Sequence, residues 1–316
     1  MSWENLRPNA KVSVGKDPKK GYSPYPWEGF IGGTLSSLII FGGSGQLGTS
    51  LSSVFSKAIT YSHSTNSRSA DITNFKGLWE IFELEKPEIV INASAYTNVD
   101  ACELEKEKAF AVNSLGVMNI ALLCREYSSK LIHFSTDYVF SGNKGQYSED
   151  SVPDPVNYYG FSKSIGDAYA LSLPSSLVIR TSGVYGYGKN FPRFVYDNLN
   201  EGKTINVIEG YYSPITSKLL ALSVKYLIEH YKNISGILNI AGEKVSRFDL
   251  ASTIATTFNF NSDLIMKTQT LPNMKALRPY DSSLSLSKSK NIIDFDFYSI
   301  DANMRSFREI LWGSQY

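Results

Sequence analysis

Residues 38–48 read Leu-Ile-Ile-Phe-Gly-Gly-Ser-Gly-Gln-Leu-Gly, a short apolar strand that runs directly into a glycine-rich turn. Beyond the turn, apolar residues recur at helical spacing, at Leu47, Leu51, Val54 and Phe55. Between a strand and a helix, such glycines permit a tight turn, close approach of a pyrophosphate and close helix packing. The helix N-terminus adds unpaired N–H groups. The stretch therefore predicts dinucleotide binding at Gly42, Gly45 and Gly48.

Strands and helices alternate along most of the chain that follows. The expected strands cover residues 58–61, 87–92, 130–134, 177–180, 204–208 and 236–241. The expected helices cover residues 75–84, 110–125, 159–173, 191–199, 218–231 and 247–258. This alternation predicts an α/β fold, a doubly wound parallel sheet of the Rossmann type with right-handed crossovers. A smaller C-terminal substrate-binding lobe is expected beside it.

The chain divides into three expected parts. Residues 1–37 contain scattered prolines, glycines and lysines without periodicity, and we expect a loosely ordered N-terminal extension. Its aromatic cluster is the part expected to dock, and consists of Tyr22, Tyr25, Trp27 and Phe30. Residues 38–182 are expected to form the dinucleotide-binding domain. Residues 183–316 are expected to form mainly the substrate-binding lobe, with some elements returning to the sheet.

The composition excludes several classes of protein. The 316 residues carry a formal net charge of +1, so no basic excess points to a nucleic-acid polymer. The longest clean apolar run is far shorter than the ~20 residues of a membrane helix. Two cysteines, neither at metal-ligand spacing to a histidine, indicate a reducing compartment and no metal site. We therefore expect a cytoplasmic protein without a membrane partner, and a homodimer is left open.

The end of the second expected strand bears on the choice of dinucleotide. NAD-binding proteins usually place a carboxylate there to hold the ribose hydroxyls. This chain reads His-Ser-Thr-Asn-Ser-Arg over residues 63–68, and the first carboxylate is Asp71. The pattern favours NADP(H), with NAD(H) left open. Arg68 is the candidate partner of the 2′-phosphate, and a solvated loop arginine is the alternative.

Two Tyr-x-x-x-Lys pairs occur in the chain, and their surroundings differ. Tyr185 and Lys189 enclose two glycines and are expected in a loop. Tyr159 and Lys163 enter a helical pattern that ends near Pro174. Residues four apart lie on one face of a helix. Only the pair at 159 and 163 is therefore predicted to bring a phenol and an ammonium group together.

These side chains predict chemistry at a carbonyl group. A phenol is a usable proton donor, and a neighbouring ammonium is expected to lower its pKa toward working pH. Thr136, delivered by the strand at 130–134, would hydrogen-bond the carbonyl oxygen as negative charge develops there. We expect Thr136, Tyr159 and Lys163 to be the catalytic residues, and Lys163 and Tyr159 also to contact the cofactor.

Further cofactor positions are expected where other strands end. Asp71 and Ile72 would reach a base edge, and the small residues before Tyr96 would admit the cofactor backbone at the crevice edge. Asn113, within the expected helix at 110–125, is a candidate for the same site or a satisfied structural amide.

Taken together, the motifs resemble those of the extended short-chain dehydrogenase/reductases, specifically the dTDP-4-dehydrorhamnose reductase family. The resemblance covers residues 38–316 and rests on GGSGQLG at 42, NASAYTNVDACE at 92, FAVN at 110, STDYVFSG at 135, NYYGFSK at 157, RTSGVYG at 180, GKNF at 188 and RPYDSSL at 278. It implies NAD(P)H-dependent reduction of the C4 keto group of dTDP-4-dehydro-L-rhamnose or a close nucleotide sugar.

The resemblance also implies roles for particular residues. Thr136, Tyr159 and Lys163 would be the catalytic set. The nicotinamide cofactor would be held by Gly45, Gln46, Leu47, Asp71, Ile72, Ser94, Ala95, Tyr96, Tyr159 and Lys163. The nucleotide sugar would lie near Thr136, Asp137 and Tyr138. Gly183 stands where relatives often carry a substrate-side tryptophan.

Two other functions remain open at the level of sequence. One is a non-catalytic NADP-binding regulatory subunit, like the methionine adenosyltransferase beta subunit. The other is reduction or epimerisation of a different nucleotide sugar, which Gly183 leaves open.

Overall fold

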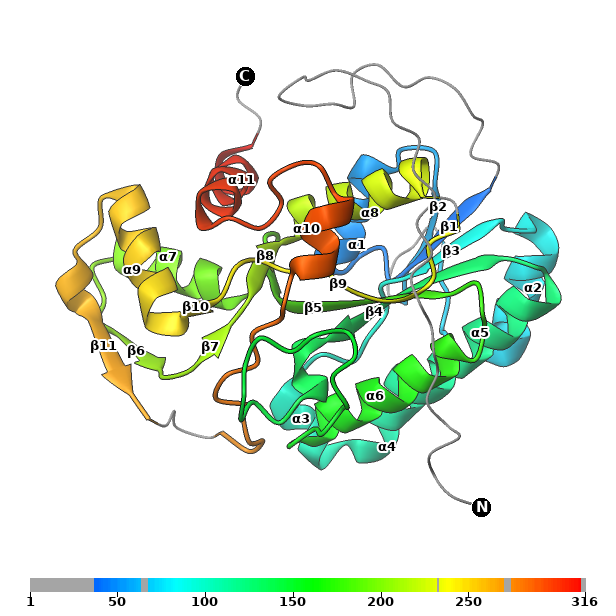
Figure 1. Cartoon of the computed structure of the whole chain (residues 1–316), viewed down its shortest axis with the longest axis horizontal. Helices are drawn as coiled ribbons and strands as arrows, with labels where there is room; N and C mark the ends of the chain where they lie inside the picture. The colour runs from blue at the N-terminus through cyan, green and yellow to red at the C-terminus, as the bar shows by residue number, and fades with distance from the viewer. Residues whose placement is uncertain (1–36, 64–67, 232, 270–273, 314–316) are drawn as a thin grey trace.

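The computed structural model describes residues 37–63, 68–231, 233–269 and 274–313. It confirms the predicted fold class (Figure 1). A seven-stranded sheet has the order β2-β1-β3-β4-β5-β8, and β9 also pairs with β5. Every pairing in this sheet is parallel. The extension predicted for residues 1–37, with its aromatic cluster, lies outside the described residues except for Ser37.

The strands of the sheet are short and lie close to their predicted positions. Their bounds are β1 Leu38–Phe41, β2 Ile59–Tyr61, β3 Ile89–Asn92, β4 Lys130–Thr136, β5 Leu177–Tyr185, β8 Pro214–Thr216 and β9 Gly236–Asn239. The first half of β5 pairs with β9, and its last residues pair with β8. The register shifts between Ser182 and Val184, so Gly183 occupies a bulge. Strand β8 was not predicted from the sequence.

Helices cover both faces of the sheet (Figure 1). One face carries α1 (Gln46–Val54) and α8 (Ser217–His230). The other carries α2 (Phe75–Glu85), α5 (Gly116–Glu126) and α6 (Tyr158–Leu171).

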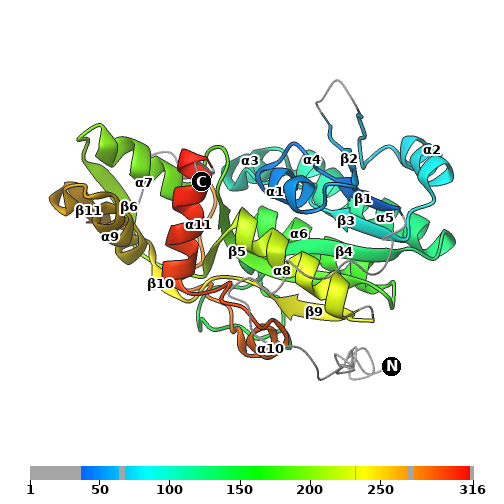
Figure 2. The ribbon, with the colours of Figure 1, turned by 90° about the horizontal axis from the view of Figure 1, so that it is seen from above.

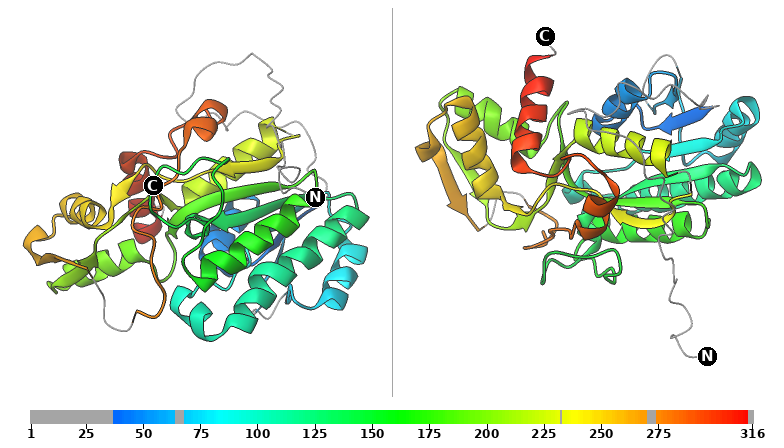
Figure 3. Two further views of the ribbon diagram at one scale, coloured as in Figure 1. Left: turned by 60° about the horizontal axis from the view of Figure 1, so that its bottom comes forward. Right: turned by 45° about the horizontal axis from the view of Figure 1, so that its top comes forward.

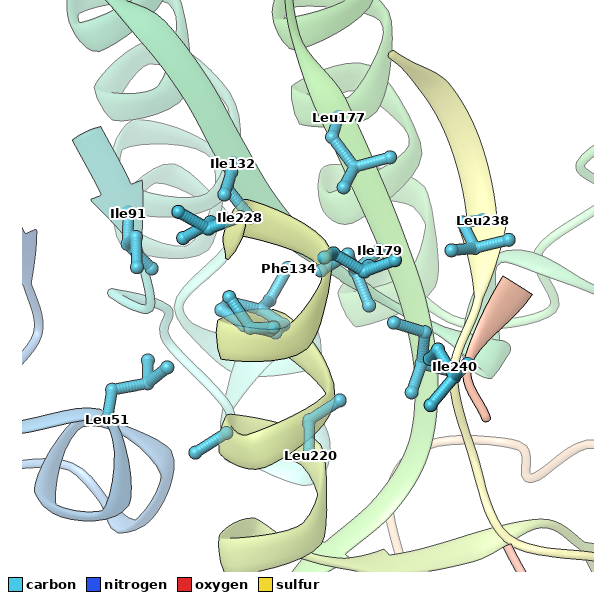
Figure 4. Packing of buried hydrophobic residues seen from close by; sticks show 14 of the residues in the cluster. Leu51, Ile91, Ile132, Phe134, Leu177, Ile179, Leu220, Ile228, Leu238 and Ile240 are labelled. Atoms are coloured by element: carbon cyan, nitrogen blue, oxygen red, sulfur yellow. The ribbon is translucent and has the colours of Figure 1, made fainter. Parts of the chain in front are cut away.

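Side chains alternate between two cores along each strand. In β1, Leu38 and Ile40 join the core under α1 and α8, whereas Ile39 and Phe41 join the core on the opposite face. Figure 4 shows the first core, where Leu220 and Ile228 of α8 lie over residues of β4 and β5. Burial on both faces explains why the strands read as continuous apolar runs.

The helix predicted over residues 110–125 contains a π-helical turn. It begins as α4 (Lys106–Phe110), passes through the π turn η2 (Ala111–Leu115) and continues as α5. A separate short helix, α3 (Val99–Leu104), precedes it. The turn contains the buried Asn113, and its side chain bonds to the backbone of the loop after β3. π turns frequently mark functional sites.

The C-terminal part builds a smaller lobe beyond the carboxyl ends of the strands (Figures 1 and 2). It contains α7 (Phe191–Asn200), α9 (Arg247–Phe258), the parallel pair β6 (Ile205–Ile208) and β11 (Ile265–Thr268), and the antiparallel pair β7 (Tyr211–Tyr212) and β10 (Val245–Ser246). Helix α11 (Ile300–Trp312) lies between lobe and sheet, and Figure 3 shows the same arrangement in two further views.

Helix α11 joins the two parts through apolar contacts. Its Ala302 packs in the core under α1 and α8, and its Met304 and Phe307 pack in the core of the lobe. Neither α11 nor the short α10 (Ser287–Ile292) was predicted from the sequence. The longest helices, α6 and α8, have 14 residues each, and the described part of the chain contains no helix with the length and apolarity to cross a membrane.

We predict that Gly166→Ala destabilises the fold, because α6 lies against the π turn at this position. A Cβ on Gly166 would be 2.1 Å from the carbonyl oxygen of Asn113. Overpacking of this kind costs about 1–3 kcal/mol. Urea denaturation should show the loss. The matched control is Gly77→Ala in α2, where the new Cβ would meet only a side-chain amide at 3.2 Å. Equal stability of the two variants would contradict the close approach of α6.

Candidate active site

The glycine turn after β1 has the geometry that a bound dinucleotide requires. Gly42 has φ +86°, and a Cβ there would lie 2.6 Å from the backbone nitrogen of Ser94. A Cβ on Gly48 would lie 2.1 Å from the Gly42 carbonyl, so strand and helix pack too closely for any side chain. Gly45 is the N-cap of α1, and no described side chain caps the helix. The free N-terminal N–H groups of α1 and the glycine turn therefore fit a diphosphate.

Gln46 and Leu47 both help to fix this turn. The Gln46 amide donates to the Val184 carbonyl at 2.6 Å and accepts from the Asn190 amide at 2.7 Å. Leu47 packs on the core under α1 and α8. The side chain of Gln46 therefore ties the glycine turn to the end of β5, and its backbone N–H is available to a cofactor.

The residues predicted near the adenosine end differ in exposure. Arg68 is exposed just after residues 64–67, which lie outside the described part. The Asp71 carboxylate accepts from the backbone N–H and hydroxyl of Thr73 at 2.9 and 2.7 Å. Burial alone would raise the pKa of Asp71, but these hydrogen bonds hold it below its usual value. Ile72 is buried against Gly116.

The loop after β3 is held in place by Asn113. The Asn113 side chain accepts from the Tyr96 N–H at 2.8 Å and donates to the Tyr96 carbonyl at 3.0 Å. Its amide also lies 3.1 Å from the Ser162 hydroxyl in α6. Asn113 therefore positions the loop that contains Ser94, Ala95 and Tyr96.

The structure brings Thr136, Tyr159 and Lys163 together at the carboxyl end of β4. Thr136 is the last residue of β4, and Tyr159 lies in the first turn of α6, whose N-cap Asn157 accepts from the Gly160 N–H at 2.8 Å. The Thr136 hydroxyl lies close enough to the Tyr159 phenol to influence its pKa. By contrast, Tyr185 is the buried last residue of β5 and Lys189 lies in the following loop, so the loop predicted for this pair is correct only for Lys189.

The ionisation of the phenol differs from the sequence-based expectation. Burial raises the pKa of Tyr159, although the hydrogen bond from Thr136 opposes the shift. The Lys163 Nζ donates to the Phe134 carbonyl at 2.6 Å, and burial decides the direction in which the pKa of the phenol shifts. A phenol with a raised pKa stays protonated at neutral pH, which is the form that donates a proton.

Asp137 and Tyr138 follow Thr136 in the short 3₁₀ turn η3 (Asp137–Val139). The buried Asp137 carboxylate accepts from the hydroxyls of Ser182 at 2.7 Å and Ser282 at 2.5 Å. It also lies 3.2 Å from the Thr136 hydroxyl. Asp137 therefore ties β5 and the segment around Ser282 to Thr136. Contact of Asp137 with a sugar stays a prediction.

Gly183 is packed against an aromatic ring of the lobe. It has φ +48°, and a Cβ there would lie 2.6 Å from Cε2 of Tyr212. The Tyr212 hydroxyl is buried and has no hydrogen-bond partner in the described structure. The guanidinium of Arg247 lies 4.9 Å from the Tyr212 ring centre. Tyr212 therefore fills the space beside Gly183.

Arg247 and Tyr212 were not predicted from the sequence as site residues. Arg247 begins α9 and hydrogen-bonds the Tyr138 phenol, whose pKa burial raises and this contact lowers. Neither residue stands in a motif, and only the fold brings α9 and β7 to Tyr138. Among the described residues, no cluster of His, Cys, Asp and Glu could hold a metal ion.

Comparison with known proteins gives a family and close structural relatives. The family described as RmlD substrate binding domain matches residues 36–309. A dTDP-4-dehydrorhamnose reductase of Aggregatibacter actinomycetemcomitans is 32% identical over 296 residues, covering 87% of this chain and all of the relative.

Two solved structures are also similar over most of their length. One, described as a hypothetical dTDP-4-dehydrorhamnose reductase from Sulfolobus tokodaii, superimposes with a TM-score of 0.80 at 40% identity, covering 85% of this chain and 98% of that one. The dTDP-4-dehydrorhamnose reductase of Bacillus anthracis, solved in complex with NADP, gives a TM-score of 0.78 at 28% identity, covering 86% and 98%.

The contact between Gly183 and Tyr212 can be tested by a double-mutant cycle of Gly183→Ala and Tyr212→Ala. The new methyl group and the Tyr212 ring would compete for one space, so G183A should destabilise the wild type more than it destabilises Y212A. The backbone strain of alanine at positive φ is present in both backgrounds and cancels. We expect a coupling of about 1–2 kcal/mol in urea denaturation. Additive effects would contradict the contact.

Proposed function

Because this chain belongs to the RmlD substrate binding domain family, we propose that it is an NADP(H)-dependent dTDP-4-dehydrorhamnose reductase. It would reduce the C4 keto group of dTDP-4-dehydro-L-rhamnose, or a close nucleotide sugar, to the alcohol of dTDP-L-rhamnose. The observation that carries this proposal is the convergence of Thr136, Tyr159 and Lys163 at the carboxyl end of β4. The alternatives of a regulatory subunit or an epimerase have no comparable support.

The geometry of the sheet supports binding of the whole dinucleotide at this edge. Strand β3 lies between β1 and β4, so the glycine turn and Thr136 are two strand spacings apart, about 10 Å. The N-terminus of α1 would hold the diphosphate, Arg68 the 2′-phosphate, and Lys163 the ribose near the nicotinamide. NADPH supplies the hydride in this chemistry. NAD(H) remains a second cofactor to be tested.

The chain's own residues would act on the carbonyl oxygen. The protonated Tyr159 phenol would give its proton to the oxygen at C4. Thr136, fixed by the N–H of Tyr138 at 3.2 Å, would turn its one hydroxyl hydrogen from Asp137 to the same oxygen when substrate binds. Asp137, Tyr138 and the surface around Gly183 would lie near the sugar.

The expected parts of the chain receive corresponding roles in this proposal. We assign cofactor binding to residues 38–182 and substrate binding mainly to residues 183–316, although β8 and β9 of the second part join the sheet. Cys102 and Cys124 are buried free thiols, in keeping with a cytoplasmic location. A homodimer remains a prediction that sedimentation can test.

Tyr159→Phe should abolish most of the reduction of dTDP-4-dehydrorhamnose by NADPH. Loss of a general acid lowers kcat by about 10²–10⁴-fold, and KM should change little. Absorbance of the nicotinamide band follows the reaction. The matched control is Tyr185→Phe from the other Tyr-x-x-x-Lys pair, because the buried Tyr185 hydroxyl has no hydrogen-bond partner in the described structure. Wild-type kcat in Y159F, or equal losses in both variants, would contradict the proposal.

Arg68→Ala should distinguish the two dinucleotides. Removing a charge-assisted hydrogen bond to the 2′-phosphate should raise KM for NADPH about tenfold. KM for NADH, which lacks this phosphate, should stay within about twofold, so each cofactor controls for the other. Equal changes of KM for NADPH and NADH would show that Arg68 does not bind the 2′-phosphate. The assignment of the catalytic residues would be unaffected.

A further inference from the structure

The spacing of four that joins Tyr159 to Lys163 continues by one more step in α6, to Asp167. Positions 159, 163 and 167 share one face of the helix. Asp167 is 3% exposed and lies beneath the catalytic pair. A buried carboxylate requires partners or a nearby cation, and its surroundings show what it does.

The two oxygens of Asp167 have different environments. Oδ2 accepts from the Ser135 hydroxyl at 2.6 Å and lies 3.8 Å from Nε of Arg180. Oδ1 has no hydrogen-bond partner in the described structure and lies 3.7 Å from Nε2 of His133. One oxygen of a fully buried carboxylate therefore faces the groups around Lys163.

Hydrogen bonding determines which nitrogen of His133 carries the proton. The side-chain oxygen of Asn92 accepts from the Ser94 N–H at 3.1 Å. The NH₂ of the same side chain therefore faces His133 Nδ1 at 3.2 Å. Nδ1 is then an acceptor, and the hydrogen of the neutral ring is on Nε2. Burial and the neighbouring Lys163 lower the pKa of His133 well below its usual value, which keeps the ring neutral.

A neutral His133 with its hydrogen on Nε2 cannot accept a hydrogen bond from the Lys163 ammonium 3.3 Å away. Among the described residues, the ammonium has one close acceptor, the Phe134 carbonyl at 2.6 Å. Burial lowers the pKa of Lys163 to about 8, and the charge of Asp167 opposes this shift. Asp167 lies one helical turn from Lys163 and borders the same His133 Nε2, at 3.7 Å from Oδ1, so it is the carboxylate placed to act as the counter-charge of Lys163.

Arg180 is the second cation beside Asp167, and it has a counter-charge of its own. Its guanidinium donates to the Glu149 carbonyl at 3.3 Å and is attracted by the Glu149 carboxylate, which is 6% exposed overall. It also lies 5.1 Å from the Phe140 ring centre. The groups that face Lys163 and Asp167 are thus Tyr159, His133, Arg180 and Ser135.

We propose that Asp167 is a positioning residue that keeps the buried Lys163 ammonium charged at working pH, so that Lys163 can hold the cofactor ribose beside Tyr159. The role in catalysis rests on the proposed function. The electrostatic dependence of Lys163 on Asp167 is a property of the protein alone and can be measured without turnover.

The test is an NMR titration of Lys163 in the free protein labelled with ¹³C- and ¹⁵N-lysine. Lys163→Arg identifies the Lys163 resonance by its disappearance. The wild-type midpoint should lie at about 8. Asp167→Asn removes the counter-charge and should lower the midpoint by about one unit or more. Asp167→Glu keeps the charge and should stay near the wild type. An unchanged midpoint in D167N would overturn the proposal.

A second variant covers the case in which D167N fails to fold because Arg180 loses its carboxylate. Asp167→Asn combined with Arg180→Met removes both charges of the buried pair, a replacement that proteins often tolerate. Loss of the Arg180 cation by itself raises the midpoint of Lys163, so the reference for the double variant is Arg180→Met alone. The midpoint in the double variant should lie below that in R180M, and equal midpoints in these two variants would overturn the proposal.

The pH profile of kcat gives a second readout. Lys163 acts when charged, so its contribution falls as pH rises through its pKa. As pH rises, kcat of D167N should therefore fall at a lower pH than kcat of the wild type. The alkaline limb of the profile should shift by the same number of pH units as the NMR midpoint. An undisplaced limb would overturn the catalytic part of the proposal. Failure of the proposed function would instead appear as absence of turnover in the wild type, and the NMR titration would still decide the role of Asp167.

Discussion

The close approach of α6 to β4 and to the π turn is the contact on which the site depends. It is possible because two positions of α6 have no side chain: a Cβ on Gly160 would be 2.0 Å from the Tyr138 carbonyl, and one on Gly166 would be 2.1 Å from the Asn113 carbonyl. Tyr159, next to the first glycine, and Lys163, between the two, thereby reach the end of β4. At a normal helix–sheet distance, the phenol could not hydrogen-bond Thr136.

This close approach buries two carboxylates in the interior, and hydroxyl groups of neighbouring segments donate hydrogen bonds to each of them. Asp137 and Asp167 are both buried. Asp137 directly follows Thr136, and Asp167 accepts from the hydroxyl of Ser135, which directly precedes it. Asp137 binds hydroxyls from β5 and from the segment around Ser282, so it joins the C-terminal half of the chain to the end of β4. Asp167 lies among Lys163, Arg180 and Ser135. These buried polar groups thus hold the two halves of the chain together and also fix Thr136 and Lys163, which we propose to be catalytic.

The sequence predicted the sheet and most of its helices because local periodicity encodes them. Strands buried on both faces, such as β1 and β4, read as apolar runs, and the glycine turn has a recognisable spacing.

The π turn at Ala111–Leu115 has no such signature in the sequence, and its Asn113 bonds to Tyr96, a residue of another segment. Strand β8 is three residues long and pairs only with the end of β5, so its sequence carries too little pattern. Roles that depend on proximity, such as those of Tyr212 and Arg247, could not be predicted, because these residues come from separate elements of the lobe. The expectation of a lowered phenol pKa was wrong for a related reason: the spacing places Lys163 near Tyr159 but does not reveal how deeply the phenol is buried.

The lack of a side chain at Gly183 affects both the path of β5 and the packing of the lobe against it. A bulge at this position lets β5 change partner from β9 to β8, and positive φ favours glycine there. Because Gly183 has no Cβ, the Tyr212 ring packs directly against it, and the Arg247 guanidinium lies over that ring. Arg247 in turn contacts Tyr138, two residues after Thr136. An aromatic ring and a cation from the lobe thus occupy the space beside Gly183. In the proposed function the proton donor comes from α6 and the wall beside the sugar comes from the lobe, so a change in that wall leaves the proton donor in place.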